Sequence, residues 1–163
     1  MLTELERSYE GYSRAVKLVM GEAERGRLKG VRGPVASLIR VPAPYAVAIE
    51  TALGGAMQHR VVEREEHGKA AIQWLKRREG GRATFLPMDT IRPVPFRESG
   101  VEQSPGFVGM GDALVECEAA YGKICANLLG RTVIAEDLDA AVAMVGAYGH
   151  GFKIVTLDGE VVT

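Results

Sequence analysis

Residues 33–42 read GPVASLIRVP, and residues 43–55 read APYAVAIETALGG. The apolar run from Val35 to Val41 predicts a short strand, and the segment that follows predicts a helix from Ala43 to Leu53. Gly54 and Gly55 then end the helix, because glycine is favoured just past a helix C-terminus. A strand followed directly by a helix is typical of a mixed α/β unit, so this stretch decides the fold class.

Strands and helices alternate through the rest of the chain. In order, we expect strand 58–63, helix 65–78, strand 82–86, a strand or loop at 107–110, helix 113–129, strand 131–135, helix 137–148 and strand 152–157. Proline and glycine recur through residues 87–106, where the sequence shows little periodicity. We therefore expect an α+β fold of two mixed α/β subdomains, residues 29–97 and 98–163.

The same order of elements occurs twice, and two spacings recur with it. Tyr45 precedes Gly54 by nine positions, as Tyr121 precedes Gly130, and Ala70 precedes Gly81 by eleven, as Ala140 precedes Gly151. These matches have two interpretations, an internal duplication or a coincidence between two common α/β units.

Residues 1–28 predict an amphipathic helix ahead of the first subdomain. Apolar residues follow at steps of three and four: Leu2, Leu5, Tyr9, Tyr12, Val16 and Val19. So narrow an apolar stripe suits a coiled-coil contact as well as a docking helix. We interpret residues 1–28 as the end of an entering coiled-coil arm that lies outside the core.

Charge divides the chain into unlike parts, although the net charge is only −1. Residues 1–97 carry 17 Lys and Arg against 11 Asp and Glu, whereas residues 98–163 carry 3 against 10. Opposite charges favour either docking within one chain or head-to-tail pairing of two copies. The basic part is also where a polyanion would bind.

Composition excludes several classes of protein. The 163 residues are 47% hydrophobic and 25% charged, which is globular composition rather than disordered. No apolar run approaches the roughly 18 residues of a membrane span, and the charged N-terminal stretch does not resemble a signal peptide. We expect a cytoplasmic protein that does not contact a membrane.

Enzyme signatures are missing from the sequence, which contains neither GxxxxGK[ST] nor GxSxG. The GxG at residues 109–111 lacks the third small residue of a dinucleotide fingerprint, because position 114 is Leu, so it predicts a tight turn. Cys117 and Cys125 are interpreted as small buried residues in a reducing cytosol. We expect no cofactor and no metal.

Carboxylates gather at Glu63, Glu65 and Glu66, and again at Glu136, Asp137 and Asp139. Acid/base chemistry or Mg²⁺ binding is one interpretation. Both groups lie at expected helix starts, however, where acidic side chains stabilise unpaired N–H groups. We favour this capping role.

The densest basic cluster is Lys76, Arg77 and Arg78, with Arg82 just beyond. A solvated helix end explains it, since helix C-termini attract cations. Non-specific contact with a phosphate backbone explains it equally well, because such binding needs only several cations together. Arg25, Arg27, Lys29 and Arg32 could widen the cluster. Trp74 in the same helix suits a core position better than a base-stacking one.

Four ordered blocks resemble the hinge domain of bacterial SMC (structural maintenance of chromosomes) proteins. They are residues 33–42 (GPVASLIRVP), 48–59 (AIETALGGAMQH), 81–87 (GRATFLP) and 152–159 (FKIVTLDG). The resemblance covers nearly all of residues 30–163. It implies a two-subdomain hinge inserted midway along a long antiparallel coiled coil.

The resemblance also implies a function. The hinge would form a homodimer about a two-fold axis, subdomain one of each copy meeting subdomain two of the other, and would join two coiled-coil arms of an ATPase that condenses and segregates chromosomes. ATP binding would reside in head domains outside this chain, so the chain itself would not be an enzyme. Accessory subunits would bind through other domains, and the protein would be associated with the nucleoid.

Two sets of residues take roles from the resemblance. Lys76, Arg77 and Arg78, with Arg82 beside them, would contact DNA weakly and without sequence specificity. Gly159, Glu160, Val161, Val162 and Thr163 would belong to the dimer interface, because in the family this block leads into a glycine-rich stretch at the dimer contact. That stretch and the returning coiled coil are expected to lie beyond residue 163. A frayed terminus is the alternative for residues 159–163.

Two other functions remain open. One is a purely structural dimer module without DNA contact. The other is a small α/β nucleotide-binding enzyme domain, whose glycine-rich turns would hold an anion at a helix N-terminus.

Overall fold

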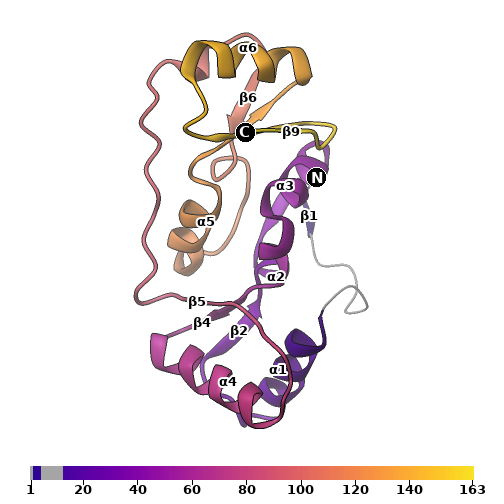
Figure 1. Ribbon diagram of the computed structural model, residues 1–163, viewed down its shortest axis with the longest axis vertical. Helices are drawn as coiled ribbons and strands as arrows, with labels where there is room; N and C mark the ends of the chain where they lie inside the picture. Colours follow the sequence, from indigo (N-terminus) through magenta and orange to yellow (C-terminus); the bar gives the residue numbers. More distant parts are fainter. Residues whose placement is uncertain (1, 5–12) are drawn as a thin grey trace.

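The computed structural model describes residues 2–4 and 13–163, and it contains two mixed sheets in an elongated molecule (Figure 1). The first sheet holds β2 (Val31–Pro34), β4 (Arg60–Val62) and β5 (Phe85–Pro87), and the second holds β6 (Phe107–Met110), β7 (Thr132–Ala135), β8 (Lys153–Thr156) and β9 (Val161–Val162). The helices are α1 (Arg14–Glu24), α2 (Val35–Leu38), α3 (Ala46–Leu53), α4 (Glu65–Arg77), α5 (Gly122–Leu129) and α6 (Leu138–Tyr148). β1 (Leu2–Glu4) pairs with β3 (Arg40–Pro42). The expected α+β class is confirmed.

The two sheets repeat one pattern of strand pairing. In each, the first strand runs antiparallel to the second, and the second runs parallel to the third. Pro34 lies opposite Arg60 and Arg60 opposite Phe85 in the first sheet, and Met110 lies opposite Val133 and Val133 opposite Ile154 in the second. Both antiparallel pairs also contain a register shift. The repeated order is therefore present, and its origin in a duplication stays a prediction.

Equivalent positions of the two halves meet at Arg40 and Glu116. Each lies five residues before the tyrosine that precedes a helix, Tyr45 or Tyr121. The Arg40 N–H donates to the Glu116 carbonyl at 2.8 Å, and the Glu116 N–H donates to the Arg40 carbonyl at 2.7 Å. This antiparallel bridge joins the two halves of the chain directly.

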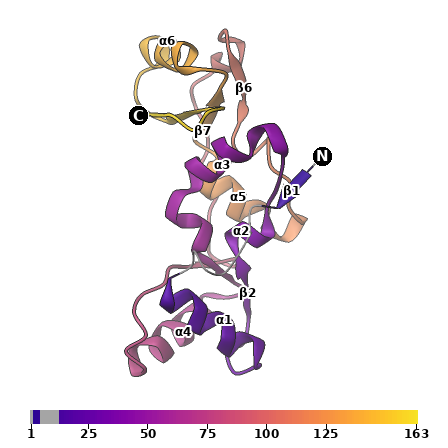
Figure 2. The same ribbon diagram turned by 90° about the vertical axis from the view of Figure 1, so that its right-hand side faces the viewer.

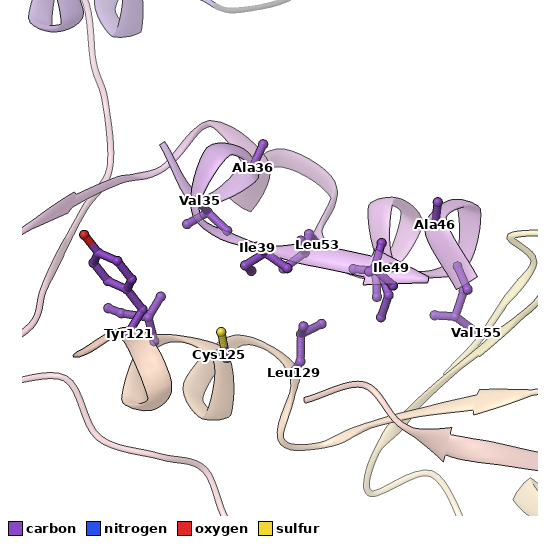
Figure 3. Close-up of a cluster of buried hydrophobic side chains, with 14 of the residues drawn as sticks. Val35, Ala36, Ile39, Ala46, Ile49, Leu53, Tyr121, Cys125, Leu129 and Val155 are labelled. Carbon is purple, nitrogen blue, oxygen red and sulfur yellow. The ribbon is translucent and has the colours of Figure 1, made fainter. Parts of the chain in front are cut away.

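The largest core cluster lies between the halves rather than within one. Figure 3 shows Ile39, Ile49 and Leu53 facing Cys125 and Leu129 of α5. The first three belong to residues 29–97 and the other two to residues 98–163, so the main apolar core depends on both parts of the chain.

The N-terminal segment differs from the expected helical arm. Leu2–Glu4 is a strand, the helix α1 begins at Arg14, and residues 1 and 5–12 lie outside the described residues. The Ser13 Oγ accepts a hydrogen bond from the Val16 N–H at 3.3 Å and so caps the helix. Ala15 and Val19 are buried against Leu75 of α4. The prediction that this segment lies outside the core is wrong for α1.

Two further elements differ from expectation. Val35–Leu38 is a helical turn instead of a strand, and the Ser37 Oγ donates to the Pro34 carbonyl at 2.9 Å across it. The second is the helix expected over 113–129, which becomes regular only at Gly122. Glu116 cannot be helical, because its backbone groups already pair with Arg40.

The segment after β5 connects residues 29–97 to residues 98–163, and it runs along the surface of the second half. Arg131 holds it, donating through Nη1 to the Pro95 carbonyl at 3.0 Å and through Nη2 to Glu98 Oε1 at 2.9 Å. The Asn127 side chain donates to the Arg92 carbonyl at 2.8 Å. The boundary between residues 97 and 98 thus lies in a segment held by hydrogen bonds to the second half, and the subdomain limits remain predictions.

Within 2–4 and 13–163, no helix combines the length and apolarity needed to cross a bilayer.

Candidate dimer edges and basic cluster

The basic cluster (Lys76, Arg77, Arg78 and Arg82) surrounds the C-terminal end of α4. All four side chains are exposed, and no ion pair joins any of them to a residue within the described ranges. The helix also begins with Glu65 and Glu66, so its charges complement the helix dipole at both ends. Since no described carboxylate forms an ion pair with the cluster, we take its charge as available to an anion.

Trp74 belongs to the core beneath this cluster. It packs against the buried group formed by Ala15, Val19 and Leu75. The guanidinium of Arg78 lies over the Trp74 ring, 4.8 Å from its centre. The core interpretation of Trp74 therefore describes its place better than that of a base-stacking platform.

Arg14 joins the cluster, although no sequence pattern pointed to it. Its Nη1 donates to the Glu79 carbonyl at 3.1 Å, which brings the start of α1 to the end of α4 (Figure 2). Arg82 lies at the same end, lining a small pocket with Ser13 and His59. Only the antiparallel packing of α1 on α4 brings these residues together, and no local pattern encodes that packing.

The other arginines suggested as an extension of the cluster lie elsewhere. Arg25 and Arg27 follow the far end of α1 and pair with the buried Glu22 at 3.5 and 3.6 Å. Arg32 pairs with Glu63 and donates to the Tyr121 hydroxyl at 3.1 Å, which raises the pKa of Arg32. These three side chains have structural partners and do not widen the basic cluster.

The acidic groups at the helix starts act partly as expected. Asp137 Oδ1 accepts the Ala140 N–H at 2.8 Å and caps α6, which confirms a capping role there. At α4 the cap comes instead from Asp89, whose carboxylate accepts the Glu65 N–H at 3.0 Å. Across the described part of the chain, no three His, Cys, Asp or Glu side chains gather closely enough to hold a metal.

Residues 159–163 form an ordered hairpin rather than a frayed end. Gly159 has a φ of +89°, and the Glu160 side chain accepts a bond from the Thr156 hydroxyl at 2.9 Å. β9 then pairs with β8, placing Val161 opposite Val155 and Val162 opposite Ile154. Val162 packs into the core under α6, while Val161 is 48% exposed.

β9 presents a free hydrogen-bonding edge. The Thr156 N–H donates to the Glu160 carbonyl at 2.9 Å, so the next opposed pair, Val155 and Val161, is of the non-hydrogen-bonded kind. The peptide groups of Val161 therefore point away from β8. No described strand pairs with this outer edge.

In the first sheet, β5 also has an edge that no described strand pairs with. Thr84 accepts from the Arg60 N–H at 3.0 Å and Met88 donates to Val62 at 2.8 Å, so the peptide groups of Phe85 between them face outward. Beside this edge runs a groove of about 740 Å³, lined by residues that include Ile72, Phe85 and Pro87. No described strand pairs with β5 in the way that β9 pairs with β8.

Comparison with known proteins gives the family of the chain. The family model described as "SMC proteins Flexible Hinge Domain" matches residues 28–145. Chromosome partition protein Smc of Halothermothrix orenii is 40% identical over 99% of this chain, and that of Bacillus subtilis is 39% identical over 99%. The chain spans 14% of the length of each of these relatives.

Solved structures give the same result. An asymmetric dimer of the Geobacillus stearothermophilus SMC hinge domain matches with a TM-score of 0.88 and 42% identity, covering 95% of this chain and 64% of that one. The Pyrococcus furiosus Smc hinge domain with an extended coiled coil matches with a TM-score of 0.74 and 31% identity, covering 91% and 52%. The chain belongs to the family of SMC flexible hinge domains.

Proposed function

We propose that this chain is a homodimerisation hinge whose two copies pair through the edges of their sheets. The observation that carries the proposal is the pair of unlike free edges, at Phe85 in β5 and at Val161 in β9. β5 of one copy would take β9 of the other, giving a continuous sheet of seven strands. A two-fold axis makes this contact twice.

Charge supports the same arrangement. β5 lies in the part of the chain with 17 Lys and Arg against 11 Asp and Glu, and β9 lies in the part with 3 against 10. Pairing β5 with the β9 of a second copy brings a basic half against an acidic half at both contacts. The match to a hinge structure solved as an asymmetric dimer supports the association of two copies.

Substitution of Val161 by proline tests the edge contact. V161P removes an N–H that points away from β8, so β9 keeps its own pairing while the outer edge loses a donor. V161T is the matched control, because it keeps the N–H. In sedimentation equilibrium we expect dimers of the wild type and of V161T, and a V161P monomer with an unchanged circular dichroism spectrum. A monomeric wild type, or a V161P dimer of wild-type affinity, would contradict the proposal.

We further propose that the basic cluster gives the hinge a weak, sequence-independent DNA surface. Lys76, Arg77, Arg78 and Arg82 are exposed at one helix end, and Arg14 adds a fifth cation. Contact with phosphate needs no base-reading geometry, so a cluster of this kind suffices. In the longer proteins, the hinge would join coiled-coil arms of a chromosome-partition ATPase at the nucleoid, with accessory subunits bound elsewhere.

The salt dependence of DNA binding tests this surface. In K76Q/R77Q/R78Q, we expect the slope of log affinity against log salt to become shallower by about 0.9 for each phosphate that the variant no longer neutralises. K123Q, which removes an exposed cation from α5, is the control. Fluorescence anisotropy with short duplex and single-stranded DNA gives the slopes. An unchanged slope in the triple variant would leave a structural dimer module without DNA contact.

A further inference from the structure

Two thiols from different elements meet beside the central core. Cys117 lies in the loop ahead of α5, and Cys125 lies on α5 itself. Their Sγ atoms are 3.1 Å apart. A disulfide bond is about 2.05 Å long, so closing one requires a movement of about 1 Å. The separation of eight residues along the chain does not by itself indicate this contact.

The two thiols differ in their access to solvent. Cys117 is half-buried between the exposed residues Glu116 and Glu118, whereas Cys125 is buried among core side chains (Figure 3). Two effects raise the pKa of the Cys125 thiol: burial, which is the larger, and the contact with Cys117. A reagent from solution therefore reaches Cys117 first, and Cys125 can react only with a sulfur already held at Cys117.

We propose that Cys117 and Cys125 form an oxidative modification site that a small disulfide closes. The Cys117 thiolate attacks one sulfur of the reagent RSSR, forming a mixed disulfide and releasing RS⁻, which takes up a proton. The Cys125 sulfur, as it loses its proton, then attacks the Cys117 sulfur and releases the second RSH. The two protein thiols are oxidised to a disulfide, and RSSR is reduced to two RSH.

The proposed bond would act on the contact between the two halves. Cys117 directly follows Glu116, which exchanges hydrogen bonds of 2.7 and 2.8 Å with Arg40. Cys125 packs in the core cluster that also contains Ile39 and Val41. Joining the two sulfurs would tether the Glu116 segment to α5 and so stabilise the place where residues 29–97 meet residues 98–163.

Oxidised and reduced glutathione provide the test, with the folded chain and the chain unfolded in urea compared in the same buffers. We expect the equilibrium constant for closing the disulfide to be at least about tenfold larger in the folded chain, which corresponds to about 30 mV. Peptide mapping by mass spectrometry should then show one bond within the chain, between Cys117 and Cys125. A constant equal to or smaller than that of the unfolded chain would overturn the proposal.

Two variants separate the steps. C125A should accumulate a mixed disulfide with glutathione at Cys117, because the resolving thiol is missing. C117S changes the more accessible position, and the remaining buried thiol should stay unmodified while the chain is folded. Rapid modification of folded C117S, or a wild-type chain that retains glutathione at Cys117, would contradict the assigned order. If C125A does not fold, the wild type and C117S still decide the matter.

Discussion

At the scale of single residues, His59 links the stability of the fold to pH. Its Nδ1 is buried without a hydrogen-bond partner among the described residues, and burial lowers the pKa of His59 below its ordinary value of 6.5. The unfolded chain therefore binds a proton at His59 more readily than the folded chain does. Stability is then complete above about pH 6.5 and is lost as the pH falls below that value.

Replacement of His59 by asparagine tests this linkage. Urea unfolding at several pH values between 5 and 8 should show a smaller loss of unfolding free energy on acidification in H59N than in the wild type. H150N replaces an exposed histidine and controls for the loss of one imidazole. An H59N chain that loses as much stability as the wild type between pH 7 and pH 5 would refute the assignment.

At the scale of elements, the side chain of Leu75 packs α1 against α4. It is 2% exposed and contacts Ala15 and Val19 of α1. L75A should destabilise the fold by about 2–5 kcal/mol, as truncation of a buried leucine usually does. Ile72, one turn earlier on α4, is 43% exposed, so I72A should change stability by less than about 1 kcal/mol. Urea denaturation followed by circular dichroism measures both, and equal losses would show that α1 is not held by this contact.

The local sequence pattern predicts those elements whose ends are marked by charged residues or by glycine. α4 matches its expected bounds because acidic and basic residues mark its two ends, and α3 matches because Gly54 stops it. The segment around Glu116 was not predictable, since its pairing with the distant Arg40 decides it. Val35–Leu38 was mistaken for a strand, because a short apolar run fits a buried helical turn as well as a buried strand. The same limit applies to the sites: the basic cluster was readable from residues 76–78, whereas the addition of Arg14 depends on the packing of α1.

At the scale of the whole molecule, the central core should make the two halves unfold together. Leu129 is fully buried and belongs to the second half, while the chain's single tryptophan, Trp74, reports on the first. L129A should lower the unfolding free energy by about 2–5 kcal/mol. The midpoints given by Trp74 fluorescence and by circular dichroism should shift equally. A fluorescence midpoint that stays at its wild-type value would show that the halves are independent domains.

The unlike edges of β5 and β9 have a mechanical consequence for the proposed dimer. Each molecule has one β5 edge and one β9 edge. Two molecules that pair at both contacts therefore use all of these edges, and no edge remains for a third molecule. The two β5–β9 contacts are separate, so one would be able to break while the other remains formed. The proposed dimer would then open at one contact while the other contact keeps the two copies together.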